Sequence, residues 1–98
     1  MAEYQLSEAA AEHITDIADY TDTSFGDNQT EAYLTGLKAS FTLIAQFPRI
    51  GVAVFEIKQG WRRHKYQKHY VFYSEQPGYV LIEAVVHTGR QIRPELFE

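Results

Sequence analysis

Residues 61–73 have the sequence WRRHKYQKHYVFY, in which four cationic and five aromatic side chains lie within thirteen positions. Aromatic side chains favour an extended, pleated backbone, so this stretch predicts two strands, residues 61–66 and 69–75, joined by a turn at Gln67 and Lys68. The cations predict that one face of the hairpin meets something acidic. An ordinary amphipathic hairpin, with its lysines and arginines in water, is the alternative interpretation.

Toward the C-terminus the pattern remains that of strands. The turn-forming residues 76–78 lead into a third strand, expected over residues 79–87. Its side chains alternate, which predicts one apolar face that packs on helices and one mixed face that is at most partly covered. The apolar face comprises Val80, Ile82, Ala84 and Val86, and the mixed face comprises Tyr79, Leu81, Glu83, Val85 and His87. In the tail, Leu96 and Phe97 need something to cover them.

The first part of the chain predicts a short strand and a helix. Residues 3–6 alternate polar and apolar side chains, which is typical of a strand. Ser7 then has the character of a helix N-cap, and residues 8–24 show the apolar stripe of an amphipathic helix. Residues 26–28, Gly-Asp-Asn, interrupt this pattern.

A second helix is expected from the Asn28 region to about Phe47. Asn28 with Glu31 predicts a capping pair at its start, and Pro48 ends it by disfavouring helical geometry at the residue before it. One flank carries small residues, which allow another helix to approach closely and so predict an antiparallel helical hairpin. These small residues are Ala32, Gly36, Ala39 and Ser40.

Together these elements predict a β-α-α-β-β-β order. Residues 52–57 are expected to add a loose edge strand. Two helices and an antiparallel sheet make an α+β fold, in which the helical hairpin packs on one face of the sheet. A chain of 98 residues supports one core, so residues 1–98 are predicted to form a single domain.

Composition narrows the class of protein further. The chain has no cysteine, which excludes disulfides and thiolate chemistry and fits a cytoplasmic protein. Its start lacks a signal peptide, and no apolar run is long enough to span a membrane. The net charge is −4, but residues 1–48 hold eight acids and one base, whereas residues 49–98 hold five acids and eight bases. An acidic half is therefore joined to a basic half.

The sequence offers little conventional catalytic chemistry. No metal site is expected, because His64 and His69 are five positions apart without further ligands in a known spacing, and no cofactor-binding motif is present. RNA cleavage without a metal remains as a hypothesis, since it needs a base, an acid and cations for the phosphorane. Candidates are His64, His69 and His87 with Arg62, Arg63, Arg90 and Arg93. The alternative interpretation is that these histidines are only surface or packing residues of the strand hairpin.

The order of these elements and their local motifs resembles the RelE/ParE toxins of bacterial toxin–antitoxin modules. YQLSEAAAEHITDIADYT is similar to the family's opening strand and first helix, and FGDNQTEAYLTGLKASFTLIAQFPRIG to its second helix. EIKQGWRRHKYQKHYVFY resembles the ParE pattern of an acid-Ile, a Gly-aromatic-Arg, a His and a terminal Phe-Tyr, and VVHTGRQ resembles the closing strand. The resemblance covers nearly the whole chain.

The resemblance implies a toxin but leaves its target open. RelE-like members cleave messenger RNA on the ribosome, whereas ParE-like members poison DNA gyrase without catalytic residues of their own. The ribonucleases usually carry a tyrosine or histidine in the basic C-terminal segment, where this chain has Pro94 and Glu95. That departure favours a gyrase inhibitor, with a ribosome-dependent endoribonuclease or an inactive antitoxin-binding relative as alternatives. The implied partners are gyrase and a ParD-like antitoxin, with which the chain could form a higher-order hetero-oligomer.

Two groups of residues are predicted to carry these interactions. The first is a basic patch for the target, formed by Trp61, Arg62, Arg63, Lys65, Lys68, Arg90 and Arg93. Internal pairing of Arg62 or Arg63 with Glu56 or Glu83 is the alternative. The second group, Tyr20, Phe25 and Tyr33 at the end of the helical hairpin, is predicted to bind the antitoxin, because exposed aromatic side chains anchor interfaces. An antitoxin helix or strand is expected to lie against this hairpin and against the free edge of the sheet, the latter by strand addition.

Overall fold

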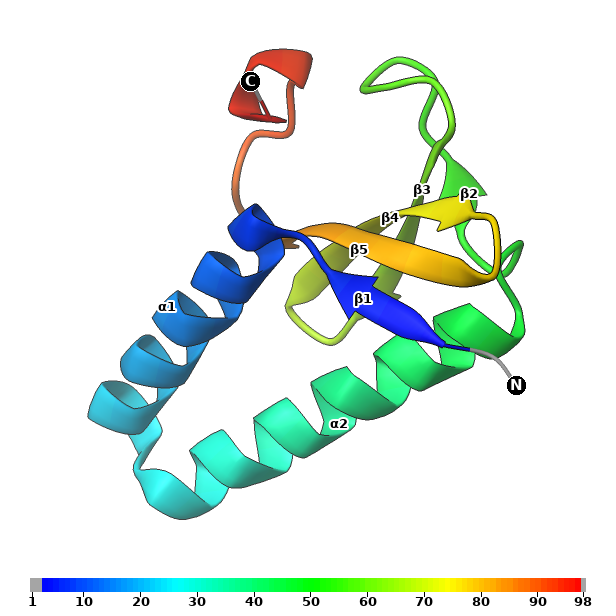
Figure 1. The fold of residues 1–98 in the computed structure, drawn as a ribbon. Coiled ribbons are helices and arrows are strands. Elements are labelled where there is room, and N and C mark those ends of the chain that lie inside the picture. Colours follow the sequence, from blue (N-terminus) through cyan, green and yellow to red (C-terminus); the bar gives the residue numbers. More distant parts are fainter. Residues whose placement is uncertain (1–2, 98) are drawn as a thin grey trace.

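The computed structural model describes residues 3–97 and places a helical hairpin against one face of a five-stranded sheet (Figure 1). The α+β prediction is therefore confirmed. The elements are β1 (Tyr4–Leu6), α1 (Glu8–Phe25), α2 (Asp27–Gln46), β2 (Val52–Ala53), β3 (Trp61–Tyr66), β4 (His69–Gln76), β5 (Tyr79–His87) and a 3-10 turn (Pro94–Phe97). Among residues 3–97, neither long helix combines the length and apolar character that a bilayer crossing requires.

The sheet has the strand order β1-β5-β4-β3-β2. β1 runs parallel to β5 and the other pairs are antiparallel, so the sheet is mixed and the prediction of an antiparallel sheet was wrong for β1. A parallel pair needs a long crossover connection, which the whole chain between β1 and β5 supplies. The edge strand β2 covers only Val52–Ala53, because the N–H groups of Ile57 and Lys58 both donate to the carbonyl of Val54 and close a turn there.

α1 begins at the predicted cap. The backbone N–H of Ala10 donates to Ser7 Oγ at 3.0 Å, and this hydroxyl in turn donates to the carbonyl of Glu83 at 2.8 Å. The predicted cap of α2 was wrong: Gly26, with a φ of 88°, stands between the two helices, and Asn28 lies inside the first turn of α2. A glycine is favoured here because few other residues adopt positive φ values.

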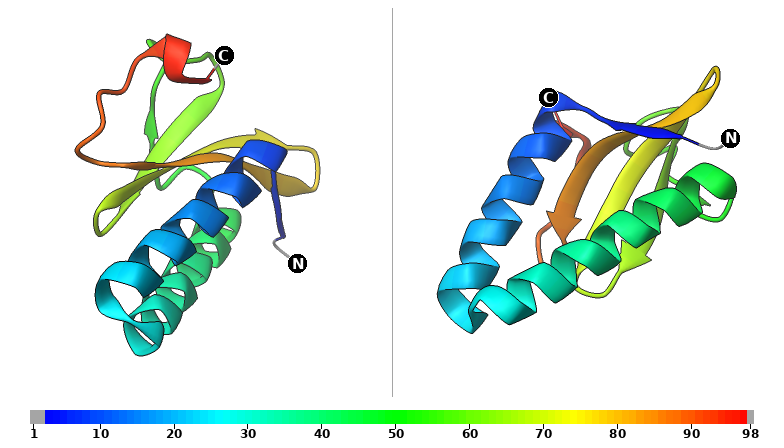
Figure 2. Two further views of the ribbon diagram at one scale, coloured as in Figure 1. Left: turned by 90° about the vertical axis from the view of Figure 1, so that its left-hand side faces the viewer. Right: turned by 60° about the horizontal axis from the view of Figure 1, so that its bottom comes forward.

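The main core lies between the helices and the sheet. It comprises Ala10, Ile17, Leu37, Phe41, Ile44, Val71, Tyr73, Val80, Ile82 and Val85. Gly36 serves a different contact from the one predicted. A methyl group added at Gly36 would lie only 2.9 Å from Cζ of Tyr66 on β3, so the glycine makes room for this ring and not for α1. The helices diverge from their turn, as Figure 1 and the right view of Figure 2 show.

A β-bulge in β5 overturns the predicted division of its faces. Tyr73 pairs with Ile82 and Phe72 with Ala84, so Glu83 is the extra residue on β5. An extra residue reverses the alternation that follows it. Val80 and Ile82 face the helices as predicted, but Ala84 and Val86 pack on the opposite face, and Val85 joins the helix-side core.

The second face of the sheet carries its own apolar cluster. Val54, Trp61, Phe72, Ala84 and Val86 are buried there. Ile92, Leu96 and Phe97 of the C-terminal segment pack against this cluster, which supplies the cover that the sequence required for Leu96 and Phe97. The left view of Figure 2 shows this segment on the side of the sheet away from the helices.

Candidate functional site

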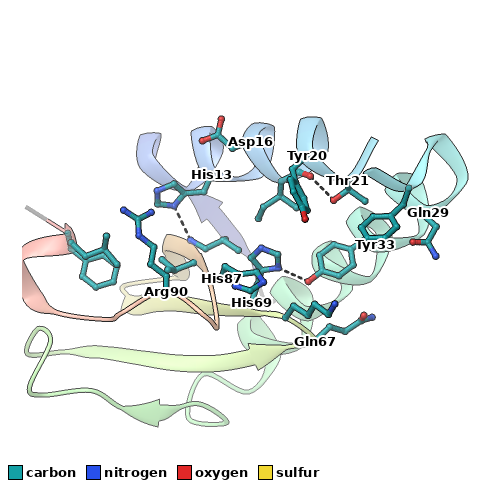
Figure 3. Close-up of a pocket in the computed structure, with 17 residues that line it drawn as sticks. His13, Asp16, Tyr20, Thr21, Gln29, Tyr33, Gln67, His69, His87 and Arg90 are labelled. Carbon is teal, nitrogen blue, oxygen red and sulfur yellow. Dashed lines mark hydrogen bonds between the residues drawn. The ribbon is translucent and has the colours of Figure 1, made fainter. Parts of the chain in front are cut away.

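A cavity of about 660 Å³ lies between α1, the start of α2 and the sheet end where β4 begins and β5 stops (Figure 3). Ile17 and Val85 give it an apolar floor, and Leu96 and Phe97 of the C-terminal turn also line it. Among residues 3–97, its polar lining includes three histidines and two cations, His13, His69, His87, Lys68 and Arg90, but one acid, Asp16. We call this site the hairpin pocket.

The three aromatic residues predicted for antitoxin binding all line the hairpin pocket. Tyr20 and Phe25 are 68% and 58% exposed, so their rings are available to a partner as predicted. Tyr33 is different, because it is half-buried and its ring lies 5.0 Å from that of Tyr66. Its hydroxyl is 2.6 Å from Nδ1 of His69. Tyr33 therefore shapes the wall of the pocket.

His69 is held between Tyr33 and His87. Its ring centroid lies 5.5 Å from that of Tyr33 and 5.4 Å from that of His87, its cross-strand partner. Burial, reinforced by the charge of His87, lowers the pKa of His69 to about 4. The imidazole is thus neutral at physiological pH, and its Nδ1 can accept the hydrogen bond of the Tyr33 hydroxyl.

His13 is a pocket residue that was not predicted from the sequence. Its Nδ1 accepts a hydrogen bond from the backbone N–H of Val85 at 3.1 Å, which ties α1 to β5 (Figure 3). Burial is the main cause that lowers its pKa. The helical spacing gave a signal, since His13 stands one turn before the buried Ile17 and so shares its inward side.

The candidate nuclease residues are only partly brought together. His69, His87 and Arg90 line the hairpin pocket. His87 Nδ1 accepts from the backbone N–H of Gly89 at 2.9 Å. His64 and Arg63 lie outside the pocket on β3, where burial lowers the pKa of His64.

The predicted basic patch does not gather on one face. Arg62 and Arg63 are neighbours on β3 and therefore point to opposite faces of the sheet. The Arg62 guanidinium donates to the carbonyl of Gly51 at 2.7 Å, whereas that of Arg63 lies 4.3 Å from the ring centroid of Tyr70. Trp61 is only 8% exposed, and its ring is part of the apolar cluster on the face of the sheet away from the helices.

The remaining predicted target residues are also divided. Lys68 and Arg90 line the hairpin pocket, and Lys65 and Arg93 are exposed elsewhere. The arrangement differs from both interpretations of the sequence, a continuous basic patch and internal pairing with carboxylates. Arg62 donates to a backbone carbonyl, and Arg63 stacks on an aromatic ring.

Comparison with known proteins decides between the families that share this fold. The family model of the ParE toxin of type II toxin–antitoxin system, parDE, matches residues 4–92. The chain belongs to the ParE toxin family. The resemblance inferred from the sequence motifs is thereby confirmed.

Relatives of known identity agree with this ParE assignment. Toxin ParE1 of Mycobacterium tuberculosis is 40% identical over 70 residues, which cover 71% of each chain. Toxin ParE1 of Caulobacter vibrioides is 33% identical over 96 residues, which cover 98% of this chain and 99% of that one. Among solved structures, this chain superposes with a TM-score of 0.76 on a chain from "Chromosomal ParDE TA system from P. aeruginosa". That match covers 89% of this chain and 96% of the other at 12% identity, which supports the shared fold alone.

Membership of the ParE family makes this chain the toxin component of a type II toxin–antitoxin system. A toxin of this kind is paired with an antitoxin, so the family also implies a protein partner.

Proposed function

We propose that this ParE toxin arrests growth by binding DNA gyrase, without chemistry of its own, and that a ParD-like antitoxin neutralises it in the cytoplasm. The family match over residues 4–92 carries the proposal. Nδ1 of His13, His69 and His87 is in each case engaged in a hydrogen bond within the fold, and burial keeps the pKa of His69 low.

The hairpin pocket is the proposed antitoxin site. The exposed rings of Tyr20 and Phe25 at its rim and the apolar floor below them suit an amphipathic segment of the partner. The excess of basic over acidic side chains in the lining favours acidic residues on that segment. A disordered antitoxin segment would fold as it enters the pocket.

The direct test is a supercoiling and cleavage assay with purified gyrase. The toxin should trap gyrase–DNA cleavage complexes, and addition of the antitoxin should prevent this. Expression of the toxin alone should stop growth with DNA-damage signalling. Growth arrest with normal supercoiling and cut messenger RNA would refute gyrase as the target.

A ribosome-dependent ribonuclease is the second candidate. One observation favours it: His69, His87 and Arg90 line a single pocket, together with Lys68. The test replaces His69, His87 and His64 by alanine, one at a time, and measures cleavage of ribosome-bound message. If all three variants remain fully toxic, the chain is not a histidine-dependent nuclease.

A further inference from the structure

Exposed apolar side chains are concentrated in the chain segment that leads into and out of the edge strand β2, away from the hairpin pocket. Of the eight large hydrophobic residues exposed among residues 3–97, five lie between the last turn of α2 and the turn after β2. They are Leu43, Phe47, Ile50, Val52 and Phe55. None of them lines the hairpin pocket. Concentrated apolar exposure of this kind marks a surface that meets a partner.

The backbone of β2 is open for hydrogen bonding at the same place. β2 is the last strand of the described sheet and pairs with β3 alone. The N–H of Val54 donates to the carbonyl of Trp61 at 3.1 Å, so the antiparallel alternation turns the N–H and C=O of Ala53 outward. Within residues 3–97 these two groups have no hydrogen-bond partner. Such an edge is a template for the addition of another strand.

Basic side chains surround this edge. Arg49 and Lys58 are exposed before and after β2, and Arg63 is the direct cross-strand neighbour of Val52. Glu56 is the single acid between positions 43 and 63. The charge balance favours an acidic strand as the occupant.

The edge is also remote from the hairpin pocket. The hairpin pocket is lined by Gln29 and Tyr33 from the first turns of α2. α2 has 20 residues and spans about 30 Å, and β2 lies beyond its last turn (Figure 1). A toxin acts when no antitoxin is bound, so its target surface is one that the free chain leaves open. The β2 edge is such a surface, and the outward N–H and C=O of Ala53 distinguish it from the hairpin pocket.

We infer that β2 and residues 47–58 form the surface through which the toxin binds its target, and that the target adds an acidic edge strand alongside β2. The inference rests on the proposed function, since it takes the target to be a protein. The sequence had predicted that the cations of β3 and the tail bind the target. In the present inference the target instead binds the outward backbone groups of Ala53 and exposed side chains such as Phe55.

The test uses substitutions that alter this edge without altering the ladder to β3. Ala53→Pro removes the outward N–H, which β3 does not use, and Ala53→Ser keeps it as the matched control. Phe55→Ser removes an exposed ring, and Leu6→Ser removes an exposed apolar side chain at the opposite edge of the sheet as its control. The measurements are growth arrest in cells, binding to purified gyrase, binding to the antitoxin, circular dichroism and the size of the free toxin in solution.

Ala53→Pro and Phe55→Ser should each weaken gyrase binding at least tenfold and relieve growth arrest, while folding and antitoxin affinity stay unchanged. The two serine controls should behave as wild type. Full toxicity of both edge variants overturns the inference. Loss of antitoxin binding in these variants also overturns it, because the antitoxin would then be the partner that binds β2. Dissociation of a toxin dimer would overturn it too, because a second copy of the chain would then occupy the edge. If wild type arrests growth without binding gyrase and the edge variants do not arrest growth, the proposed gyrase target fails but the surface stands.

Discussion

The Tyr73 hydroxyl fastens the loop after α2 to the core. It donates to the carbonyl of Pro48 at 2.7 Å and accepts from the N–H of Gly51 at 2.9 Å, and Tyr73 is fully buried. Tyr73→Phe removes both bonds, each worth about 1 kcal/mol, and leaves the buried N–H of Gly51 unpaired at a further cost of about 1–2 kcal/mol. The expected loss is about 3–4 kcal/mol, which at about 4–8 °C per kcal/mol corresponds to a decrease in Tm of about 12–32 °C for a domain of this size.

Urea unfolding at fixed temperature, followed by circular dichroism, measures this change. Tyr70→Phe is the matched control, because it removes a phenol from the same strand for which no hydrogen bond exists within residues 3–97. The control should change the free energy of unfolding by less than about 0.5 kcal/mol. If both variants lose the same free energy, the Tyr73 hydroxyl does not anchor the loop.

Three further predictions concern the pocket and its walls. Gly36→Ala should destabilise the fold by about 1–2 kcal/mol in urea unfolding, because the added methyl displaces the Tyr66 ring; the same change in a Tyr66→Phe background should cost less. The pKa of about 4 leaves His69 neutral in the fold while the unfolded chain takes up a proton below about pH 6.5, so stability should fall between about pH 6.5 and 4. The full shift corresponds to about 3 kcal/mol, which solvent screening of this half-buried ring reduces to about 1–2 kcal/mol, and a His69→Gln variant should lose that part of the pH dependence. Phe25→Glu should weaken antitoxin binding at least tenfold in calorimetry with an unchanged circular dichroism spectrum; unchanged affinity would place the antitoxin elsewhere.

The sequence predicted those features that depend on local pattern. The cap at Ser7, the two amphipathic helices and the strands of residues 61–87 follow from periodicity and turn chemistry, and the structure places them within one or two residues of the expected bounds. The exposed rings of Tyr20 and Phe25 were also predictable, because both stand at the end of the helical hairpin, beyond what a two-layer core needs.

Features that depend on contacts between distant segments could not be predicted in this way. The parallel pairing of β1 with β5 has no local signature, and neither does the contact between Gly36 and Tyr66. Strand alternation did imply that Arg62 and Arg63 point to opposite faces of the sheet, so the pattern of residues 61–66 already separates these two cations.

The bulge at Glu83 is the long-range feature on which the hairpin pocket depends. Without it, strict alternation from Ile82 would turn Val85 and His87 to the other face of the sheet, away from α1. The bulge residue is held by two hydrogen bonds, since its carbonyl accepts from Ser7 Oγ and its carboxylate from Ser74 Oγ at 2.7 Å.

Two single-residue deletions in β5 therefore have opposite expected outcomes. Deleting Glu83 joins Ile82 directly to Ala84, which keeps every observed cross-strand pair and every buried side chain on its present face, so the loss should be limited to about 1–3 kcal/mol for the two hydrogen bonds. The deletion of Leu81 is different. If residues 84–87 keep their pairs with β4, Glu83 takes the place of Ile82 in the helix-side core and Ile82 turns to the other face. This arrangement buries an unpaired carboxylate and should abolish cooperative folding. Thermal unfolding by circular dichroism separates the two cases. If both deletions lose the same amount of structure, the bulge stabilises β5 in some way other than by setting the register of its residues. In that case strand alternation does not explain why Val85 and His87 lie on the side of α1.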